Sequence, residues 1–426
     1  MPRVINENRL FFSICIALVV ASLTFAIRAN LIGTLSNEFG LTPLELGNVI
    51  GAAFWGFTVA MLLGGLLCDL VGLKSMFILA FLGHFIGIVL TIISKNYLLL
   101  FISTLFVGLG NGFIESASYT LISSLYPKNK TIMLSKWHIW FPAGIVIGGL
   151  LAWGLALLSI SWRIQMAVIL VPTIFYGILM FNQIFPRSER ISLGVTYREM
   201  FKECINPLFI FMVLCMLLTS ATELGTNQWI AELLSEIGVP SILLLVFING
   251  IMTIGRANAG KVLSKFSSIN LLIISSILSC LGLLWLGHSE GYLSFVAAGI
   301  FALGICFFWP LMIGFVSENL PKTGPLGLSI MGGAGLLSTA LIQPFFSQVF
   351  NSELNKLLPF NKSLENLKSS SAGPEAAEIL HQIRLEAGAN TLTYVAILPG
   401  VLILAFIILQ MIIKKRKQKS ITKAYN

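Results

Sequence analysis

The sequence predicts an all-α membrane protein, with twelve transmembrane helices in two six-helix pseudo-symmetric repeats, and three observations predict it. Of its 426 residues, 56% are hydrophobic and only 11% are charged, whereas a soluble domain carries about 25% charged residues. The apolar residues run in unbroken stretches, which argues against a transmembrane β-barrel because barrel strands alternate apolar and polar residues. Windows of about 19 residues give twelve stretches long enough to span a bilayer, and landmarks of the first six recur in the last six.

In chain order, each predicted span is a stretch close to the 20 or so apolar residues that a spanning helix needs. The first exceeds the apolar core of a signal peptide and no small-residue cleavage site follows it, so we expect it to stay in the mature protein. The spans lie near 10–34, 47–68, 74–94, 97–121, 137–159, 162–184, 207–231, 241–262, 268–288, 291–316, 325–350 and 391–413.

The basic residues predict the orientation of these spans. With the N-terminus in the cytoplasm, 20 of the 27 Lys and Arg residues face the cytoplasm, six face the other side and one, Arg28, lies inside a span. Basic loops mark the cytoplasmic side of a membrane protein. We therefore expect a multi-pass protein of the plasma (bacterial inner) membrane with both termini in the cytoplasm. The net charge of +9 reflects this bias, which excludes nucleic acid as a partner.

The loops predict the domain organisation. Tyr197–Glu203 looks like a short amphipathic helix on the membrane surface. An extracytoplasmic loop over 351–390 contains Pro374, which can open a short helix, and a basic cytoplasmic tail covers 414–426. The expected parts are an N-terminal six-helix bundle (1–185), a cytoplasmic linker (186–206) and a C-terminal six-helix bundle (207–426).

An internal repeat relates the two halves at one offset of 195 residues. Two parallel repeats of this kind place a substrate site near the membrane midplane, between the halves. The matching pairs are Gly65 with Gly260, Arg28 with Glu223, and Phe106–Gly110 with Phe301–Ile305.

The loop after the second span resembles the signature loop of the major facilitator superfamily. Its glycines allow a tight turn between helices, and its charged residues can contact neighbouring helix ends. The matching residues are Gly65, Leu67, Asp69, Gly72 and Lys74; Gly255, Arg256, Gly260 and Lys265 resemble a degenerate second copy without the aspartate. The resemblance covers essentially the whole chain and implies the major facilitator fold. Because Arg256 lies near the cytoplasmic end of the eighth span, we expect its side chain to extend to the cytoplasmic surface.

Two further segments resemble the fucose-type sugar:proton symporter family. Gly112–Ser118 is similar to its glycine-x-x-glutamate segment, and Leu134–His138 is similar to its leucine-asparagine-x-x-histidine entry to the fifth span. By this resemblance, Glu115 takes part in proton coupling or in hydrogen bonding to a sugar. The fucose-type pattern has an aspartate in the first span, where this chain has Arg28-Ala29-Asn30.

Three ionisable residues lie well inside the apolar spans: Arg28, Glu115 and Glu223. Such residues are costly in a membrane and normally face the interior of the helix bundle. Asn111 lies four residues before Glu115, and Asn227 four residues after Glu223, so each amide shares a helix face with a carboxyl. These residues either bind the solute and the coupling proton, or Arg28 forms a permanent ion pair with one glutamate.

Two aromatic positions complete the predicted site. His138 can titrate near neutral pH and lies beside Trp137, whose face suits a sugar ring; the alternative is an interfacial aromatic belt. Trp309, followed by Pro310, marks a helix kink whose indole either lines a cavity or packs in a gate. His84, in the third span, reads as a packing residue.

No motif points to an enzyme. The chain has no phosphate-binding loop, no nucleophile elbow and no zinc-protease helix, and its six cysteines lie far apart. We therefore expect no catalytic residue, no metal and no cofactor. The prediction is a monomeric secondary active transporter that moves a small polar solute, a sugar by preference, by proton-coupled alternating access. Two alternatives stay open: Arg28 clamps an anionic or zwitterionic solute (organic acid, amino acid or sugar phosphate), or the fold serves as a solute sensor.

Overall fold

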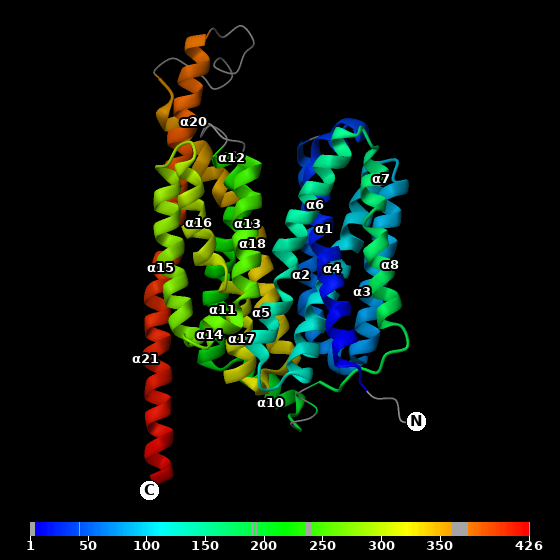
Figure 1. The fold of residues 1–426 in the computed structure, drawn as a ribbon, viewed down its shortest axis with the longest axis vertical. Helices are drawn as coiled ribbons and strands as arrows, with labels where there is room; N and C mark the ends of the chain where they lie inside the picture. Colours follow the sequence, from blue (N-terminus) through cyan, green and yellow to red (C-terminus); the bar gives the residue numbers. More distant parts are fainter. Residues whose placement is uncertain are drawn as a thin grey trace. The chain divides into compact units, whose positions relative to one another are not determined.

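The structure, a computed structural model, describes residues 5–41, 43–188, 191, 194–234, 241–359 and 374–425. Every regular element in this part of the chain is helical (Figure 1). The first half contains α1 (Glu7–Phe39), α2 (Pro43–Leu70), α3 (Gly72–Ile93), α4 (Tyr97–Leu125), α5 (Lys130–Trp137), α6 (Trp140–Leu157), α7 (Trp162–Ala167), α8 (Leu170–Met180) and the linker helix α10 (Tyr197–Cys204).

The second half is also helical wherever it is described. Its elements are α11 (Pro207–Ser220), the π-helix η1 (Ala221–Gly225), α12 (Thr226–Leu233), α13 (Ser241–Ala257), α14 (Ala259–Leu263), α15 (Ser268–Gly287), α16 (Leu293–Ile305), α17 (Phe308–Asn319), the 3-10 helix η2 (Pro321–Thr323), α18 (Gly324–Leu357), α20 (Pro374–Val395) and α21 (Ile397–Tyr425).

The spans follow the hydropathy pattern closely. Among the described residues, eleven helical stretches are long and apolar enough to cross a membrane, and Leu243–Ala257 is a shorter apolar helix where the predicted eighth span lies. The loop predicted over 351–390 is largely helical where it is described, because α18 continues to Leu357 and α20 covers 22 residues from Pro374. The short helix expected there is in fact about six turns long, and it leads directly toward α21.

Two spans are interrupted at positions that proline dictates. A proline cannot donate to the carbonyl four residues before it, and its ring clashes with that carbonyl. Pro142 acts in this way on His138, where α5 and α6 are separated, and Pro310 acts on Cys306, where α16 and α17 are separated. Each interruption leaves a backbone carbonyl without its helical partner, in the interior of a span.

Contacts divide the chain into two compact units, which are described separately. The first comprises Met1–Met216, Arg256–Gly260 and Trp309–Leu337, and the second comprises Leu217–Gly255, Lys261–Phe308 and Ser338–Asn426. The first unit thus contains segments from both halves of the sequence. Its helices approach one another at small residues: a Cβ on Gly83 of α3 would lie 2.8 Å from the backbone of Gly110 in α4. Such close packing needs glycine, as in other membrane helix pairs.

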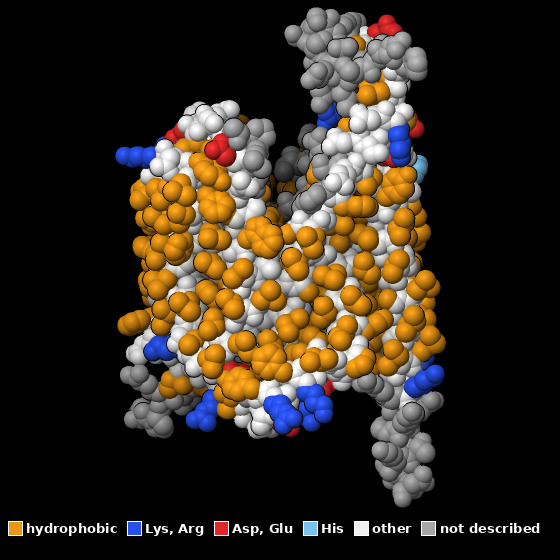
Figure 2. All heavy atoms as spheres, turned by 180° about the vertical axis from the view of Figure 1, so that it is seen from behind, with side chains coloured by type: hydrophobic (Ala, Val, Ile, Leu, Met, Phe, Trp, Pro, Cys, Tyr) orange, Lys and Arg blue, Asp and Glu red, His pale blue; other side chains and the backbone are white. Residues whose placement is uncertain are grey.

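The surface is apolar over the middle of the helices and charged at their ends. Figure 2 shows hydrophobic side chains along the helices, with Lys and Arg gathered beyond them. Exposed side chains include Trp153, Val171 and Leu404, each more than 60% exposed. Surfaces of this kind are stable in a lipid bilayer and not in water. We call the end of the first unit that carries Arg9, Lys74, Lys128 and Lys322 its basic end.

Candidate functional site

Glu115 lies inside the first unit, in a chain of hydrogen bonds that links two distant segments. Its carboxyl is 4% exposed. The hydroxyl of Tyr119, one helical turn later, donates to Glu115 Oε1. Trp309 Nε1, at the start of α17, donates to the Tyr119 hydroxyl oxygen at 2.5 Å. An indole N–H can only donate, so the phenol accepts from Trp309 and directs its own proton at the carboxyl.

His138 lies beside this chain in an aromatic surround. Ring centroids lie 4.6 Å away for Trp137, 5.8 Å for Tyr119 and 6.4 Å for Trp309. His138 is 4% exposed and Trp137 is fully buried, and the Trp137 indole donates to the carbonyl of Ile14 at 3.0 Å. Neither residue therefore belongs to an interfacial aromatic belt. The Nε2 atom of His138 is buried with no hydrogen-bond partner in the described part of the chain.

Arg256 corrects one prediction. Its side chain does not reach the surface: it is 2% exposed, and Nη1 donates to the carbonyl oxygen of His138 at 3.2 Å. This carbonyl is the one that Pro142 leaves without a helical partner, so the helix interruption supplies a buried acceptor for the guanidinium. The structure thereby brings Glu115, His138, Arg256 and Trp309 into one cluster, from four different predicted spans.

Asn111 joins a different network from the one that its spacing suggested. Its Oδ1 atom lies 2.8 Å from Nε2 of His84, and its Nδ2 donates to Thr24 Oγ1 at 3.4 Å. Because an amide oxygen only accepts, the His84 proton is on Nε2, and Nδ1 accepts from the hydroxyl of Tyr176 at 3.0 Å. This buried chain ties α8, α3, α4 and α1 together. His84 is therefore hydrogen-bonded on both nitrogens, in addition to the packing role that the sequence suggested.

Arg28 is buried without an ion pair to Glu115. Its side chain is 8% exposed, and Nη2 has no hydrogen-bond partner among the described residues. The carboxyl that the ion-pair alternative would assign to it, Glu115, is instead bonded by Tyr119. A buried guanidinium group is costly in a membrane, and no ion pair neutralises that of Arg28 within the described part of the chain.

Glu223 and Asn227 lie in the second unit, at an irregular point of the seventh span. Glu223 is 3% exposed and belongs to the π-helix η1, a feature that is frequent at functional sites. Asn227 Oδ1 is buried without a hydrogen-bond partner in the described residues. Half a turn further on, Trp229 stacks on Phe346 of α18, with centroids 6.1 Å apart and an interplanar angle of 9°. This unit therefore offers a carboxyl, an amide and an aromatic pair.

The signature loop makes three distinct contacts. Gly72 has a φ of +80°, a conformation that glycine adopts without strain, and it allows the turn from α2 into α3. Asp69 Oδ1 accepts from Ser188 Oγ of the linker at 2.5 Å. A Cβ on Gly65 would lie 2.7 Å from Cα of Leu326, so α2 lies directly against the start of α18. Lys74 is exposed at the basic end.

Gly255 belongs to the second unit, where a Cβ would lie 2.6 Å from Sγ of Cys306. Gly255 therefore lets α13 approach the point where Pro310 interrupts the tenth span. The degenerate copy of the signature loop thus serves packing at a helix interruption.

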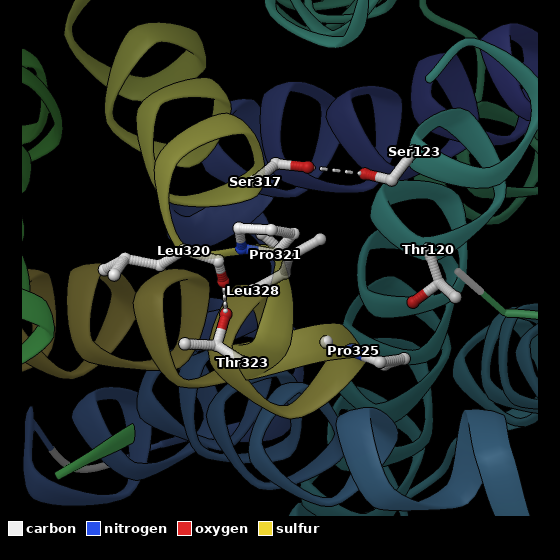
Figure 3. Close-up of a pocket in the computed structure, with 9 residues that line it drawn as sticks. Thr120, Ser123, Ser317, Leu320, Pro321, Thr323, Pro325 and Leu328 are labelled. Carbon is white, nitrogen blue, oxygen red and sulfur yellow. Dashed lines mark hydrogen bonds between the residues drawn. The ribbon is translucent and has the colours of Figure 1, made fainter. Parts of the chain in front are cut away.

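Hydroxyl groups close the basic end of the first unit, a feature that the sequence reading missed. Along one face of α4, Ser116 Oγ lies 2.6 Å from Ser329 Oγ, and Ser123 Oγ lies 3.0 Å from Ser317 Oγ. Lys130 Nζ, at the start of α5, also donates to the carbonyl of Ser317 at 3.1 Å. Figure 3 shows the Ser123–Ser317 bond at the edge of a narrow pocket. The lining residues are Thr120, Ser123, Ser317, Leu320, Pro321, Thr323, Gly324, Pro325 and Leu328.

The hydroxyls that line this pocket donate to groups of the chain itself. Thr323 Oγ1 donates to the Leu320 carbonyl at 2.8 Å, and Thr120 Oγ1 donates to the Ser116 carbonyl at 3.3 Å. The two serine pairs, in contrast, join residues about 200 positions apart in the sequence: Ser116 and Ser329, for example, are separated by 213 positions. No periodicity or motif marks such a pair, because serine is common in apolar helices for packing alone.

Comparison with known proteins gives one family. The model of the Major Facilitator Superfamily matches residues 14–347. The uncharacterized MFS-type transporter EfpA of Mycobacterium tuberculosis is 24% identical over 329 residues, which are 73% of this chain and 59% of EfpA. The gentisate transporter of Corynebacterium glutamicum is 25% identical over 220 residues, 48% of this chain and 49% of that protein. The chain thus spans less than two thirds of the length of these relatives.

Solved structures share the fold over nearly the whole chain. The E. coli fucose:proton symporter FucP gives a TM-score of 0.68 at 13% identity, covering 92% of this chain and 98% of FucP. The proton:xylose symporter XylE gives 0.67 at 15%, covering 92% and 95%. The human organic anion transporter MFSD10 gives 0.68 at 13%, covering 94% and 99%. At these identities the likeness concerns the fold alone, and it confirms the predicted twelve-helix architecture.

Proposed function

The chain belongs to the Major Facilitator Superfamily, and on that basis we propose that it moves a small polar solute, a sugar by preference, by proton-coupled alternating access. Members of this superfamily are transporters and not enzymes. The observation that carries the proposal is the buried carboxyl of Glu115 at the end of a hydrogen-bond chain from Trp309. A carboxyl inside the membrane is costly and therefore marks a candidate site for a solute or a proton. The hydrogen bond to Oε1 of this carboxyl comes from a neutral group, the phenol of Tyr119.

The surroundings of Glu115 suit both tasks. The rings of Trp309 and His138 lie 6.4 Å apart beside Tyr119, the partner of the carboxyl, and aromatic faces pack against the apolar faces of sugar rings. The carboxyl and the unpartnered Nε2 of His138 offer hydrogen bonds for hydroxyl groups. Within the second unit, Glu223 and Asn227 offer a carboxyl and an amide for the same tasks. The fucose:proton and proton:xylose symporters, which share the fold, support a sugar as the solute.

The proposal is tested with purified protein in proteoliposomes. Uptake of radiolabelled fucose and xylose is measured with and without an imposed inward proton gradient, together with pH changes inside the vesicles. Glu115→Gln keeps the shape of the side chain and removes its titratable proton, so the gradient should no longer accelerate uptake. Glu386→Gln, an identical change at an exposed position of α20, is the matched control. If Glu115→Gln transported as well as the control and with the same gradient dependence, Glu115 would have no coupling role.

A second candidate function has its own observation, the buried and unneutralised Arg28. A guanidinium group binds a carboxylate through two parallel hydrogen bonds, which a lysine cannot reproduce. We propose as the alternative that Arg28 clamps an anionic solute, and the similarity to the gentisate transporter and to the human organic anion transporter favours this class. Gentisate is the probe: Arg28→Lys should weaken its binding by about tenfold or more, since hydrogen bonds to charged groups contribute about 1.5–3 kcal/mol each. Unchanged gentisate binding in Arg28→Lys and Arg28→Gln would exclude the clamp.

The orientation and assembly belong to the same proposal. The basic bias of 20 in 27 residues supports an orientation with both termini in the cytoplasm of a plasma or bacterial inner membrane. The proposal also includes the proton as the coupling ion and a monomer as the working form. The two six-helix bundles, 1–185 and 207–426, would move about the solute site, with 186–206 as their linker. Labelling of a cysteine added next to Asn426 from one side of sealed vesicles tests the orientation.

A further inference from the structure

Tyr119 occupies a position that the proposed function leaves without a role. It is fully buried, and its hydroxyl bonds both the carboxyl of Glu115 and the indole of Trp309. Glu115 belongs to the first half of the sequence and Trp309 to the second, and both lie in the first unit. The phenol therefore connects the carboxyl to α17, which also carries Ser317, the partner of Ser123 at the basic end.

The donors and acceptors of this chain depend on the protonation state of Glu115. When the carboxyl is ionised, it only accepts, so the phenol donates to it and its oxygen stays free for the Trp309 N–H. Hydrogen bonds to an ionised acceptor are about twice as strong as neutral ones. When the carboxyl is protonated, its own O–H becomes a donor. The other carboxyl oxygen still accepts from the phenol, but this bond is no longer assisted by charge, so the chain from Trp309 to Glu115 becomes weaker.

The remaining titratable and charged groups around the phenol do not replace this link. His138 lies with its ring 5.8 Å from that of Tyr119, but its Nε2 has no partner in the described chain. Arg256 of α13 donates to the backbone carbonyl of His138, an acceptor that does not titrate. Glu115 is the titratable group bonded directly to the phenol, and its protonation changes the strength of that bond.

We infer that Tyr119 is the positioning residue through which the protonation state of Glu115 controls the hold on Trp309, and thereby the closure of the basic end. This rests on the proposed function, in which Glu115 carries the coupling proton. With Glu115 ionised, the chain from Trp309 to Glu115 is complete and the basic end is held closed. Protonation weakens the bond to Trp309 and releases α17. The hydroxyl pairs Ser116–Ser329 and Ser123–Ser317 lie along the same face of α4 and separate in the same movement.

The experiment measures the closure directly and needs no solute. Spin labels are attached at Gln183→Cys, at the end of α8, and Lys322→Cys, in η2, in a variant whose native cysteines are replaced. Distances between the labels are measured by double electron–electron resonance in lipid nanodiscs, from about pH 5.5 to about pH 8.5, a range in which buried carboxyls titrate. The short, closed distance should gain population as the pH rises.

Three substitutions are compared in that labelled background. Tyr119→Phe keeps the ring and removes the hydroxyl, and it should abolish the pH dependence of the distance distribution, as Glu115→Gln should. Trp309→Phe removes the indole donor and should give the same loss. Ser123→Ala is the matched control, because it removes one hydroxyl pair of the closure without touching the chain to Glu115. It should lower the closed population at every pH and keep the transition.

Each outcome decides between a link and simple packing. A Tyr119→Phe protein that keeps the wild-type pH transition overturns the inference, while loss of the transition in Glu115→Gln alone would leave the proton role of Glu115 intact. A wild-type protein with no pH transition also overturns the inference, and proton-driven uptake in vesicles would then still test the proposed function separately. Thermal unfolding of each variant shows that it is folded; if Tyr119→Phe does not fold, Trp309→Phe supplies the same comparison.

Discussion

Gly65 gives the most direct test of the closed arrangement in the first unit. Replacing Gly65 by alanine adds one methyl group where α2 lies against the start of α18. That Cβ would lie 2.7 Å from Cα of Leu326, 2.8 Å from the carbonyl oxygen of Pro325 and 2.8 Å from Cβ of Ser329. Two of the three atoms belong to the backbone, so no side-chain rotation relieves the overlap. The substitution must move the start of α18 away from α2.

The magnitude follows from two opposing terms. An alanine in a helix interior is more favourable than glycine by about 0.5–1 kcal/mol, but this gain is present in every conformation in which α2 is helical. It therefore cancels between the closed arrangement and any other. The overlap costs about 1–3 kcal/mol, as overpacking usually does, and only the closed arrangement pays it. The closed population should fall by about 5-fold to 150-fold relative to its alternatives.

The assay is the distance between spin labels at Gln183 and Lys322, measured at a pH where the wild-type protein is mostly closed. Gly149→Ala is the matched control, because Gly149 is also inside a helix, α6, and a Cβ there meets nothing within 4 Å. We expect Gly65→Ala to shift the distribution toward longer distances and Gly149→Ala to leave it as in the wild type. Identical distributions for the two alanine variants would refute the contact between α2 and α18 as a determinant of closure.

Three further predictions concern stability. Asn111→Ala leaves the buried Nε2–H of His84 without its acceptor, so the free energy of unfolding should fall by about 1–3 kcal/mol; an unchanged denaturation midpoint would contradict the network. The hydrogen bond from Lys356 at 2.6 Å holds the pKa of Glu353 below its ordinary value of 4.5, so its stabilisation is present above pH 4.5 and is lost as the pH falls through the lowered value. Glu353→Gln should therefore have a lower melting temperature than the wild type at neutral pH and the same melting temperature in acid. A difference in melting temperature that does not change with pH would exclude this cause. Thr196→Ala removes the side-chain cap of α10, should cost about 1 kcal/mol of local stability, and should speed amide exchange in that helix but not in α6.

The structure brings some residues of the predicted site together and separates others. Glu115, His138 and Trp309 do lie together, because each is a polar or aromatic group at a buried point of a span. Asn111 was grouped with Glu115 by its four-residue spacing, but that spacing fixes only the helix face and not the helix opposite. His84 and Thr24 lie opposite Asn111, and no feature within α4 indicates them.

Arg256 shows the same limit for a charged residue. From the sequence, a basic residue close to the end of a span is expected to extend into water. The structure buries it because Pro142, in a span far away in the sequence, leaves the carbonyl of His138 without a helical partner. The sequence shows the proline, but it does not show which helix supplies the donor to the carbonyl that lacks its helical partner.

The sequence by itself determined the class of protein, its spans and the family, because these depend on the hydrophobicity of continuous segments and on a local loop motif. It also marked the few ionisable residues in the membrane, since each is costly there on its own. Only the tertiary structure decided which of them meet: the Trp309–Tyr119–Glu115 chain, the buried Arg256 and the serine pairs that close the basic end. Those contacts join residues about 100 to 200 positions apart, and their energies depend on distances between helices that no single helix encodes.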